Sequence, residues 1–467
     1  MTRAQVVRSL GLFEGRKTPK VTEIGDTGSI TVKHEVPRPM QGNNRLSRRQ
    51  VTTTIGVGAA AALAGCSANF VGQTSETEVP TIKVAGWGQG VEREIIQEIL
   101  RNYDSSNESV NVSYQAIPGG QYTSKLKTQF AGGTEPDVFY LSGERCLQYI
   151  ENGAILDLSP HLGNDPEYEF DDLLDNLLEP FRYQGGIYGI PKDFTPVGLY
   201  YNASHLEEAG VGEVPETWDG LRSAFEAVKQ NTDIEYPMGF AGQPRQTFFT
   251  FLFQNGGEVL NDGGTECLIG SNEAIEALQF LVDLHDDGLA GIYSDEISVS
   301  WSGPALGEEH TTTAMAGAWV FPTLQDQYSD VFESIEMVEE MPIPSGGQQT
   351  TMLLTVAWAA SGTPADEQAA AELVKALTGT EGMWEWAKTG IALPSRQSLL
   401  DRPYYDERPM LDNLAQFTDG GKPFNFGIHH ERIVSTILSE VEGALTGVKS
   451  ADNAMKSAQR LINNNIL

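Results

Sequence analysis

Cysteine and positive charge are both scarce in this chain of 467 residues. Its three cysteines are too few to build a disulfide framework. Only 31 Lys and Arg stand against 64 Asp and Glu, which gives a formal net charge of −33. A protein that binds nucleic acid needs a cationic face to replace the phosphate counterions, so the composition excludes a nucleic-acid partner.

Apolar residues are plentiful enough for globular packing. They make up 40% of the chain, which also contains 23 Pro and 7 Trp, so wholesale disorder is excluded. The length is roughly two to three times that of a typical single domain, so we expect more than one hydrophobic core.

The charge is unevenly distributed along the chain. Residues 1–65 contain ten basic and four acidic side chains. Residues 66–467 therefore hold 21 Lys and Arg against 60 Asp and Glu, a net charge of −39, with only ten Lys. Hydrated carboxylates at this density keep a protein soluble where salt screens their repulsion within about 3 Å at 1 M. The second part is typical of a halophile.

The basic first part contains the pattern of an export signal. A polar, basic segment at 43–51 precedes a Gly- and Ala-rich apolar run at 55–65 and then Cys66. The run is about half of the ~20 residues needed to span a bilayer, and a basic lead followed by a short apolar run and small residues is typical of a signal peptide. The alternative is a buried Ala-rich helix, which the paired arginines and the Leu-Ala-Gly-Cys sequence at 63–66 disfavour.

Two motifs within this signal indicate its type. Ser47, Arg48 and Arg49 resemble a twin-arginine signal, and residues 63–66 resemble a lipobox in which Cys66 becomes the lipidated first residue of the mature chain. Met40 lies where such a signal peptide would begin. We therefore predict a non-translated or disordered extension at 1–39, a signal peptide at 40–65 and a flexible tether at 66–79.

Strand and helix patterns alternate after the tether. Residues 81–85 and 110–116 alternate as strands, 136–141 is a third strand, and helical spacing fills the intervals between them. This order predicts βαβ units and a mostly parallel sheet. Such sheets bind ligands at the carboxyl ends of their strands, here near Trp87 and residues 142–144.

A series of short motifs in a fixed order extends over nearly all of residues 80–467. They are Gly-Gly-Thr-Glu-Pro-Asp-Val at 132–138, Glu-Asn-Gly-Ala-Ile-Leu-Asp-Leu at 151–158, Gly-Ile-Pro-Lys-Asp at 189–193, Gly-Leu-Tyr-Tyr-Asn at 198–202, Pro-Glu-Thr-Trp-Asp at 215–219, Ala-Met-Ala-Gly-Ala-Trp at 314–319 and Ala-Leu-Thr-Gly at 444–447. In these motifs the chain resembles the family 1 extracellular solute-binding proteins, the sugar-binding lipoproteins of ABC importers, which are related in plan to maltose-binding protein. Its acidity resembles that of a haloarchaeal member.

The resemblance implies an α/β fold with two lobes, hinge strands and a ligand cleft between the lobes that closes around a sugar or polyol. We expect the chain to cross between the lobes near 192–197 and 341–345. The expected N-terminal lobe comprises 80–193 and 342–390, and the expected C-terminal lobe 194–341 and 391–467. The resemblance also implies a monomer without a cofactor, anchored on the outer face of the cytoplasmic membrane and partnered by ABC permease subunits.

Aromatic rings are candidates for the ligand site because a sugar's C–H groups pack on a π-face of opposite sign. The candidates at predicted strand ends and loops are Trp87, Phe248, Phe249, Trp301, Trp319 and Trp358. Trp319 follows the family's Ala-Met-x-Gly-x-Trp turn, and the family places ligand-facing aromatics near Trp358. For each ring the alternative is core packing.

Polar candidates are side chains that satisfy sugar hydroxyls in a dry cleft. Asp193 at the first crossing leads them, followed by Glu144 and by Arg396, whose guanidinium can fork; Gln89 and Gln121 are further candidates. For each charged residue the alternative is a solvated surface charge.

Enzyme motifs are absent: the chain contains no Gly-x-Ser-x-Gly, His-Glu-x-x-His or P-loop sequence. We therefore predict a binding protein rather than an enzyme. A secreted carbohydrate-active enzyme and a ligand-sensing lipoprotein that feeds a membrane receptor stay open as alternatives. The adjacent His429 and His430 point apart, unlike metal ligands. Cys146 and Cys267 are expected to be free, buried thiols in different lobes.

Overall fold

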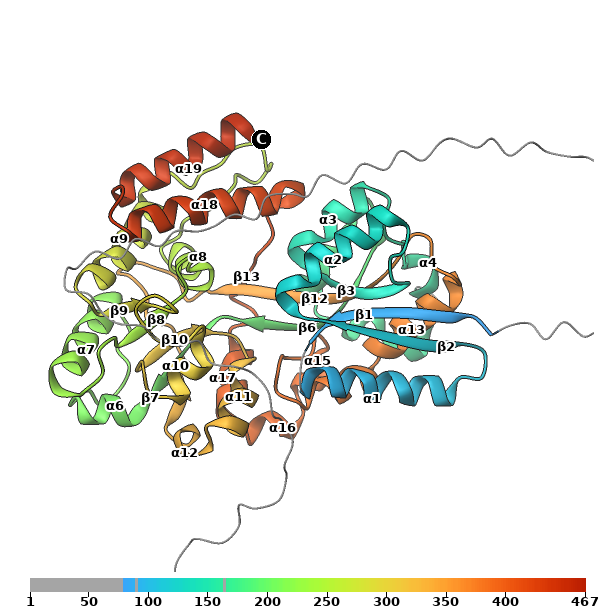
Figure 1. Ribbon diagram of the computed structural model, residues 1–467, viewed down its shortest axis with the longest axis horizontal. Helices are drawn as coiled ribbons and strands as arrows, with labels where there is room; N and C mark the ends of the chain where they lie inside the picture. The colour runs from blue at the N-terminus through green and yellow to red at the C-terminus, as the bar shows by residue number, and fades with distance from the viewer. Residues whose placement is uncertain (1–78, 89–90, 163–164) are drawn as a thin grey trace, which may run out of the picture. The chain divides into compact units, whose positions relative to one another are not determined.

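The computed structural model of the protein describes residues 79–88, 91–162 and 165–467. Within these ranges two large hydrophobic cores form, one around a six-stranded sheet and one around a five-stranded sheet. We call them the first lobe and the second lobe, and Figure 1 shows the strands that run between them. None of the helices in the described ranges is both long and apolar enough to cross a membrane.

The first lobe is built from the βαβ units that the sequence predicts. Its sheet has the order β13-β12-β3-β1-β2, in which β1 pairs in parallel with both β2 and β3. The connecting helices lie between these strands in the chain, and α13 and α14 add buried residues to the core. The elements are β1 (Thr81–Trp87), α1 (Val91–Ser106), β2 (Asn111–Ile117), α2 (Gly119–Gly132), β3 (Val138–Ser142), α3 (Gly143–Glu151), α13 (Glu367–Thr378), α14 (Thr380–Ala387) and β13 (Lys422–Pro423).

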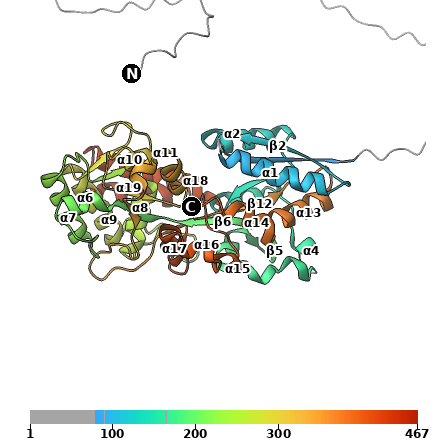
Figure 2. The same ribbon diagram turned by 90° about the horizontal axis from the view of Figure 1, so that it is seen from below.

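The second lobe contains a mixed sheet of order β11-β7-β10-β8-β9, covered by helices from both the middle and the end of the chain (Figure 2). Its strands are β7 (Gly198–Asn202), β8 (Met238–Phe240), β9 (Ala290–Ile292), β10 (Thr313–Ala316) and β11 (Ile335–Met337). Its helices include α6 (Ala203–Glu208), α7 (Trp218–Asn231), α8 (Arg245–Gln254), α9 (Asn272–Asp286), α10 (Ser302–Gly307), α11 (Val320–Gln327), α12 (Ser329–Phe332), α17 (Pro409–Gln416), α18 (His430–Leu445) and α19 (Ala451–Asn465).

Side-chain caps begin several of these helices. The Thr217 hydroxyl accepts the N–H of Gly220 at the start of α7, and Ser271 and Ser450 cap α9 and α19 in the same way. Such caps satisfy N–H groups that have no partner within the helix. The helix boundaries are therefore determined locally by the sequence.

Two antiparallel strands join the lobes. β6 (Ile190–Pro196) pairs with β12 (Met352–Ala360), from Leu353 opposite Pro196 to Trp358 opposite Ile190. The first lobe's core contains Ile190 and Trp358, whereas the second lobe's core contains Phe194 and Leu353. The predicted two-lobed α/β fold with hinge strands is confirmed.

The second crossing lies later in the chain than we expected. The prediction of 341–345 is wrong, because Met352 and Leu353 still belong to the second lobe's core, as Met341 does. The Gln349 side chain holds it there: it accepts the Met341 N–H at 3.0 Å and donates to the Met341 carbonyl at 2.9 Å. The chain crosses within β12 instead.

The two cysteines in the described ranges are free and buried. Cys146 lies in the first lobe's core and Cys267 in the second, as predicted. Burial raises the pKa of the Cys267 thiol to about 11, so this thiol is protonated at neutral pH.

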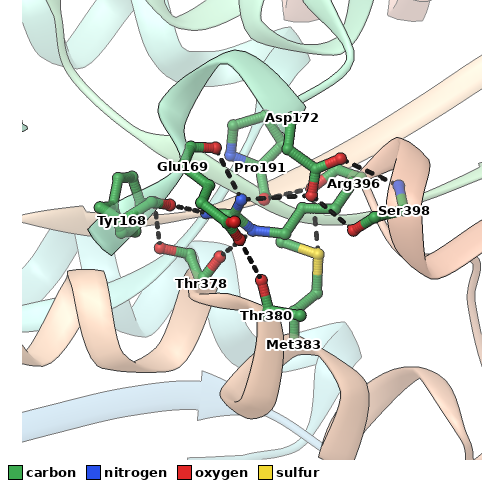
Figure 3. Close-up of polar contacts among 10 residues, drawn as sticks. Tyr168, Glu169, Asp172, Pro191, Thr378, Thr380, Met383, Arg396 and Ser398 are labelled. Atoms are coloured by element: carbon green, nitrogen blue, oxygen red, sulfur yellow. Dashed lines mark hydrogen bonds and ion pairs between the residues drawn. The ribbon is translucent and has the colours of Figure 1, made fainter. Parts of the chain in front are cut away.

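A fully buried arginine ties together three segments of the first lobe (Figure 3). The Arg396 Nε donates to the carbonyl of Thr378 at 2.8 Å. Its Nη1 and Nη2 donate to the carbonyls of Glu169 and Tyr168 at 2.9 and 2.8 Å. Asp172 supplies the counter-charge at 3.4 Å. The prediction that Arg396 forks onto a ligand is therefore wrong, because the chain's own carbonyls use its donors.

We expect Arg396→Met to reduce the free energy of unfolding by about 3–5 kcal/mol, because it leaves buried carbonyls and a carboxylate without partners. Arg402→Met is the matched control: the Arg402 guanidinium lies 4.2 Å from the centre of the Trp384 ring, and its removal is expected to reduce the free energy of unfolding by no more than about 1 kcal/mol. Urea unfolding at constant salt measures both. Equal losses in the two variants would contradict this assignment.

Candidate functional site

The candidate site lies at the carboxyl ends of β1 and β3, the position at which parallel sheets bind ligands. β1 leads into Trp87 and Gly88, and β3 leads into Gly143 and α3. The second lobe reaches this edge, because the Asn425 side chain donates to the Gly143 carbonyl at 3.3 Å. Groups from both lobes therefore meet here.

Trp87 is half-buried at the end of β1. Its ring contacts Tyr122 and Tyr140 edge to face, with centroids 5.2 and 5.0 Å apart. Two supporting rings fix its orientation while part of its surface stays exposed, so its assignment as a ligand contact stays a prediction.

A buried ion pair lies on the crossing strand β6 beneath this edge. The Asp193 carboxylate pairs with the ammonium of Lys192, and its Oδ2 accepts the Trp386 indole N–H at 2.7 Å. Lys192 in turn lies over the rings of Trp386 and Tyr140, 3.8 and 4.4 Å from their centres. Because these neighbours occupy Oδ2, Asp193 positions Lys192 and Trp386, and only Oδ1 could accept a ligand hydroxyl.

Glu92 belongs to the same polar group, although the sequence analysis missed it. Its carboxyl group lies against Gly88, whose φ of 143° favours glycine and where a Cβ would approach the Glu92 Cδ to 3.0 Å. Burial raises the pKa of Glu92 to about 7; nearby Lys192 opposes this shift and Asp193 adds to it. An acid in the first turn of a helix is so common that the sequence did not single it out.

Two tyrosine hydroxyls lie close to Glu92 and have no hydrogen-bond partner within the described residues. They are the buried Oη atoms of Tyr114 and Tyr140. The charge of Glu92 contributes to a raised pKa at both tyrosines. Buried polar atoms without partners are rare, and their concentration here is typical of a functional site.

Two tryptophans stand at helix starts in the second lobe, and both stay half-buried at the edge of its core. Trp301 precedes α10 and Trp319 precedes α11. A Cβ at Gly317 would lie 2.3 Å from the Trp319 ring, so the glycine of the Ala-Met-x-Gly-x-Trp turn permits this close approach. The Thr195 hydroxyl on β6 accepts the Ala318 N–H at 2.9 Å, which fixes the turn to the crossing strand.

Three other predicted aromatics, Phe248, Phe249 and Trp358, are core residues. Phe248 is 0% exposed in the buried helix α8, and Trp358 is 1% exposed in β12 between β3 and β6. The Trp358 ring packs 4.4 Å from that of Tyr140. The prediction that these rings face a ligand is wrong, because neighbouring elements cover Phe248 and Trp358; Phe249 is equally buried.

Charged side chains connect the lobes at the start of α3. Arg145 Nε lies 2.5 Å from Glu431 Oε1 on α18, and Lys127 Nζ lies 3.7 Å from Glu431 Oε2. Glu144, a predicted site residue, lies 3.4 Å from Arg145 and 3.8 Å from Arg245 of α8. We call these five residues the bridging cluster.

Comparison with known proteins identifies the family. Residues 98–413 match the family described as bacterial extracellular solute-binding protein. The chain is 25% identical to the erythritol/L-threitol-binding protein of Mycolicibacterium smegmatis, over 66% of this chain and 69% of that protein. It is 24% identical to a binding protein of Brucella abortus but spans about half of that relative's length, 47%.

Solved structures with low sequence identity share the fold. The acarbose-binding GacH receptor of Streptomyces glaucescens superimposes with a TM-score of 0.73 at 19% identity, covering 82% of this chain and 97% of that one. An ABC substrate-binding protein of Listeria monocytogenes in complex with cycloalternan gives a TM-score of 0.74 at 23% identity, covering 83% and 99%.

The raised pKa of Glu92 predicts a pH-dependent stability. Between pH 4.5 and 7 the folded protein holds a proton that the unfolded chain releases. Rising pH therefore lowers the free energy of unfolding across this window, by at most about 3 kcal/mol, since one pKa unit is worth about 1.4 kcal/mol. Glu92→Gln is expected to lose this contribution, and the exposed Glu94→Gln on the same helix is expected to retain it. Urea unfolding at several pH values measures the difference, and identical profiles for wild type and Glu92→Gln would refute the assignment.

Proposed function

Because the chain belongs to the bacterial extracellular solute-binding protein family, we propose that it is the substrate-binding component of an ABC importer. Its ligand, a sugar or polyol, binds between the two lobes. The observation that supports this most directly is the placement of half-buried tryptophans on both lobes. Trp87 packs on Tyr140, whose ring also contacts Lys192 of the hinge strand, and Trp319 lies on a turn fixed to β6. Rotation about β6 and β12 would bring such rings against a ligand.

The names of the relatives favour a polyhydroxylated ligand. Proteins named for binding erythritol and L-threitol or lactose share sequence with this chain, and a receptor solved in complex with acarbose shares its fold. Aromatic faces combined with a few hydrogen-bonding groups suit such ligands. These relatives are binding proteins by name, which favours binding over hydrolysis; a carbohydrate-active enzyme or a sensing lipoprotein is the alternative.

We further propose export and lipid anchoring. The twin arginines, the apolar run and Cys66 lie outside the described residues, so this proposal rests on the sequence pattern. Two acyl chains on Cys66 would hold the binding lobes at the outer face of the cytoplasmic membrane and raise their effective concentration near the permease subunits. The net charge of −39 on residues 66–467 supports a high-salt habitat and a monomer.

We expect Trp319→Ala to weaken saccharide binding by at least about tenfold, because a stacked ring at the centre of a binding site is worth roughly 2 kcal/mol. Phe280→Ala is the matched control, since Phe280 is also a partly buried ring at the margin of the second lobe's core but packs against Trp218. Isothermal titration calorimetry in high salt, with lactose, maltose and erythritol as probes, measures both variants.

The same titrations distinguish binding from hydrolysis. Mass spectrometry is expected to recover the saccharide intact after prolonged incubation. Cleaved product would favour the enzyme alternative, and an unaltered affinity in Trp319→Ala would remove this tryptophan from the site.

Replacement of the proposed lipid attachment site is expected to release the protein. In cells that express Cys66→Ser, the chain should appear in the medium rather than in the membrane fraction, because the acyl chains that anchor it are lost. Immunoblotting of the two fractions measures this, with Cys146→Ser as the control that leaves anchoring unchanged. Retention of Cys66→Ser in the membrane fraction would contradict lipid anchoring.

A further inference from the structure

Positive charge collects at the end of β3, where charged groups of the two lobes meet. Three of the 21 Lys and Arg in residues 66–467 belong to the bridging cluster: Lys127, Arg145 and Arg245. Their anionic partners there are Glu144 and Glu431. The cluster therefore has a net charge of +1 within a body whose net charge is −39.

The guanidinium of Arg245 has few hydrogen-bonding or ionic partners within the described residues. Its nearest carboxylate, on Glu144, is 3.8 Å away, and the guanidinium lies 5.5 Å from the centre of the Phe424 ring. Within the described residues no hydrogen bond is found for its five N–H donors. The side chain is 33% exposed, so its fork is accessible from solvent.

Glu144 is the complementary group. Its side chain is only 9% exposed, yet its cationic neighbours lie at 3.4 and 3.8 Å, beyond strong hydrogen-bonding distance. A largely buried carboxylate with such loose partners retains lone pairs for additional donors. The guanidinium of Arg245 can therefore donate hydrogen bonds to a ligand, and the neighbouring carboxylate of Glu144 can accept them.

The imidazole of His430 lies next to the bridging cluster. His430 is 4% exposed and lies beside Phe424, with ring centres 4.9 Å apart. Burial, together with the smaller effect of the charges of Arg245 and Arg145, lowers its pKa to about 3, and Glu431 opposes this shift. His430 is therefore neutral at physiological pH and adds no charge to the bridging cluster.

We propose that the ligand of this site carries one oxyanion, the carboxylate of a sugar acid or a phosphate monoester, which the guanidinium of Arg245 binds while Glu144 accepts a ligand hydroxyl. This inference rests on the proposed function and specifies its substrate class. A fixed, planar guanidinium matches an oxyanion with two parallel hydrogen bonds. The single negative charge of a carboxylate would neutralise the excess charge of the bridging cluster, and a phosphate monoester would bring a charge closer to −2. The ligand hydroxyl would donate to the free lone pairs of Glu144.

The position at the start of α3 makes this recognition dependent on both lobes. Arg245 belongs to the second lobe and Glu144 to the first. An oxyanion held by Arg245 with an adjacent hydroxyl held by Glu144 would connect the lobes through the ligand. A neutral sugar offers only hydroxyl acceptors to Arg245, and hydrogen bonds to an ionised acceptor are about twice as strong.

Calorimetry with matched acid and neutral pairs tests the proposal. The probes are lactobionate against lactose, glucuronate against glucose, and glucose 6-phosphate, with the full-length protein in high salt. We expect at least one acid to bind about 10- to 100-fold more tightly than its neutral partner, as a charge-assisted hydrogen bond predicts. Tighter binding of the carboxylates would identify the ligand as a sugar acid, and tighter binding of glucose 6-phosphate would identify it as a phosphate monoester.

Two variants assign the preference to the guanidinium. Arg245→Gln is expected to reduce the ratio of acid affinity to neutral affinity to within about threefold. Arg245→Lys keeps the charge but loses the fork, and it is expected to retain part of the preference for the acid. Arg222→Gln is the control, because Arg222 is also 33% exposed and ion-paired but lies on α7. Equal binding of acid and neutral partners would overturn this inference and leave the proposed function standing. Absence of binding by every probe would overturn both.

Discussion

The pairing of β6 with β12 is the constraint on which the other features depend. The two strands are hydrogen-bonded to each other across the boundary between the cores, and the pairing shifts register between Val356 and Ala357. Such irregularities increase local twist and bend a strand. Side chains reinforce the pairing, since the Thr355 hydroxyl donates to the Asp193 carbonyl at 3.0 Å. Rotation of one lobe against the other must be absorbed within this short antiparallel segment.

The site is built directly on this hinge. Lys192 and Asp193 on β6 support Trp386 and lie close to Glu92, while Thr195 on the same strand fixes the turn before Trp319. The proposed ligand contacts of both lobes are therefore held by β6, and a change in hinge geometry would move them together. The bridging cluster adds a second connection at the start of α3, where a ligand that satisfies Arg245 and Glu144 would stabilise one arrangement of the lobes.

The fold followed from the sequence more readily than the site did. Strand and helix periodicity is a local property, so β1, β2 and β3 were predictable, as was the turn before Trp319. Contacts between side chains and their partners far apart in the chain could not be predicted in this way. Asp193 was predicted to bind a ligand, yet Trp386 satisfies one of its oxygens, and Arg396 is enclosed by carbonyls more than 200 residues earlier in the chain. The raised pKa of Glu92 depends on burial, which an ordinary acid in a helix's first turn does not reveal.

Lobe closure is the central claim, and the distance between the lobes tests it most directly. Spin labels can be placed at Ser124→Cys on α2 and Ser329→Cys on α12, both exposed, in a chain whose own three cysteines are replaced by serine. Double electron–electron resonance then measures the distance with and without the saccharide that calorimetry finds to bind most tightly. The account predicts that saturating ligand moves the distribution to a new, narrower distance. An identical distribution in both states would contradict hinge closure about β6 and β12.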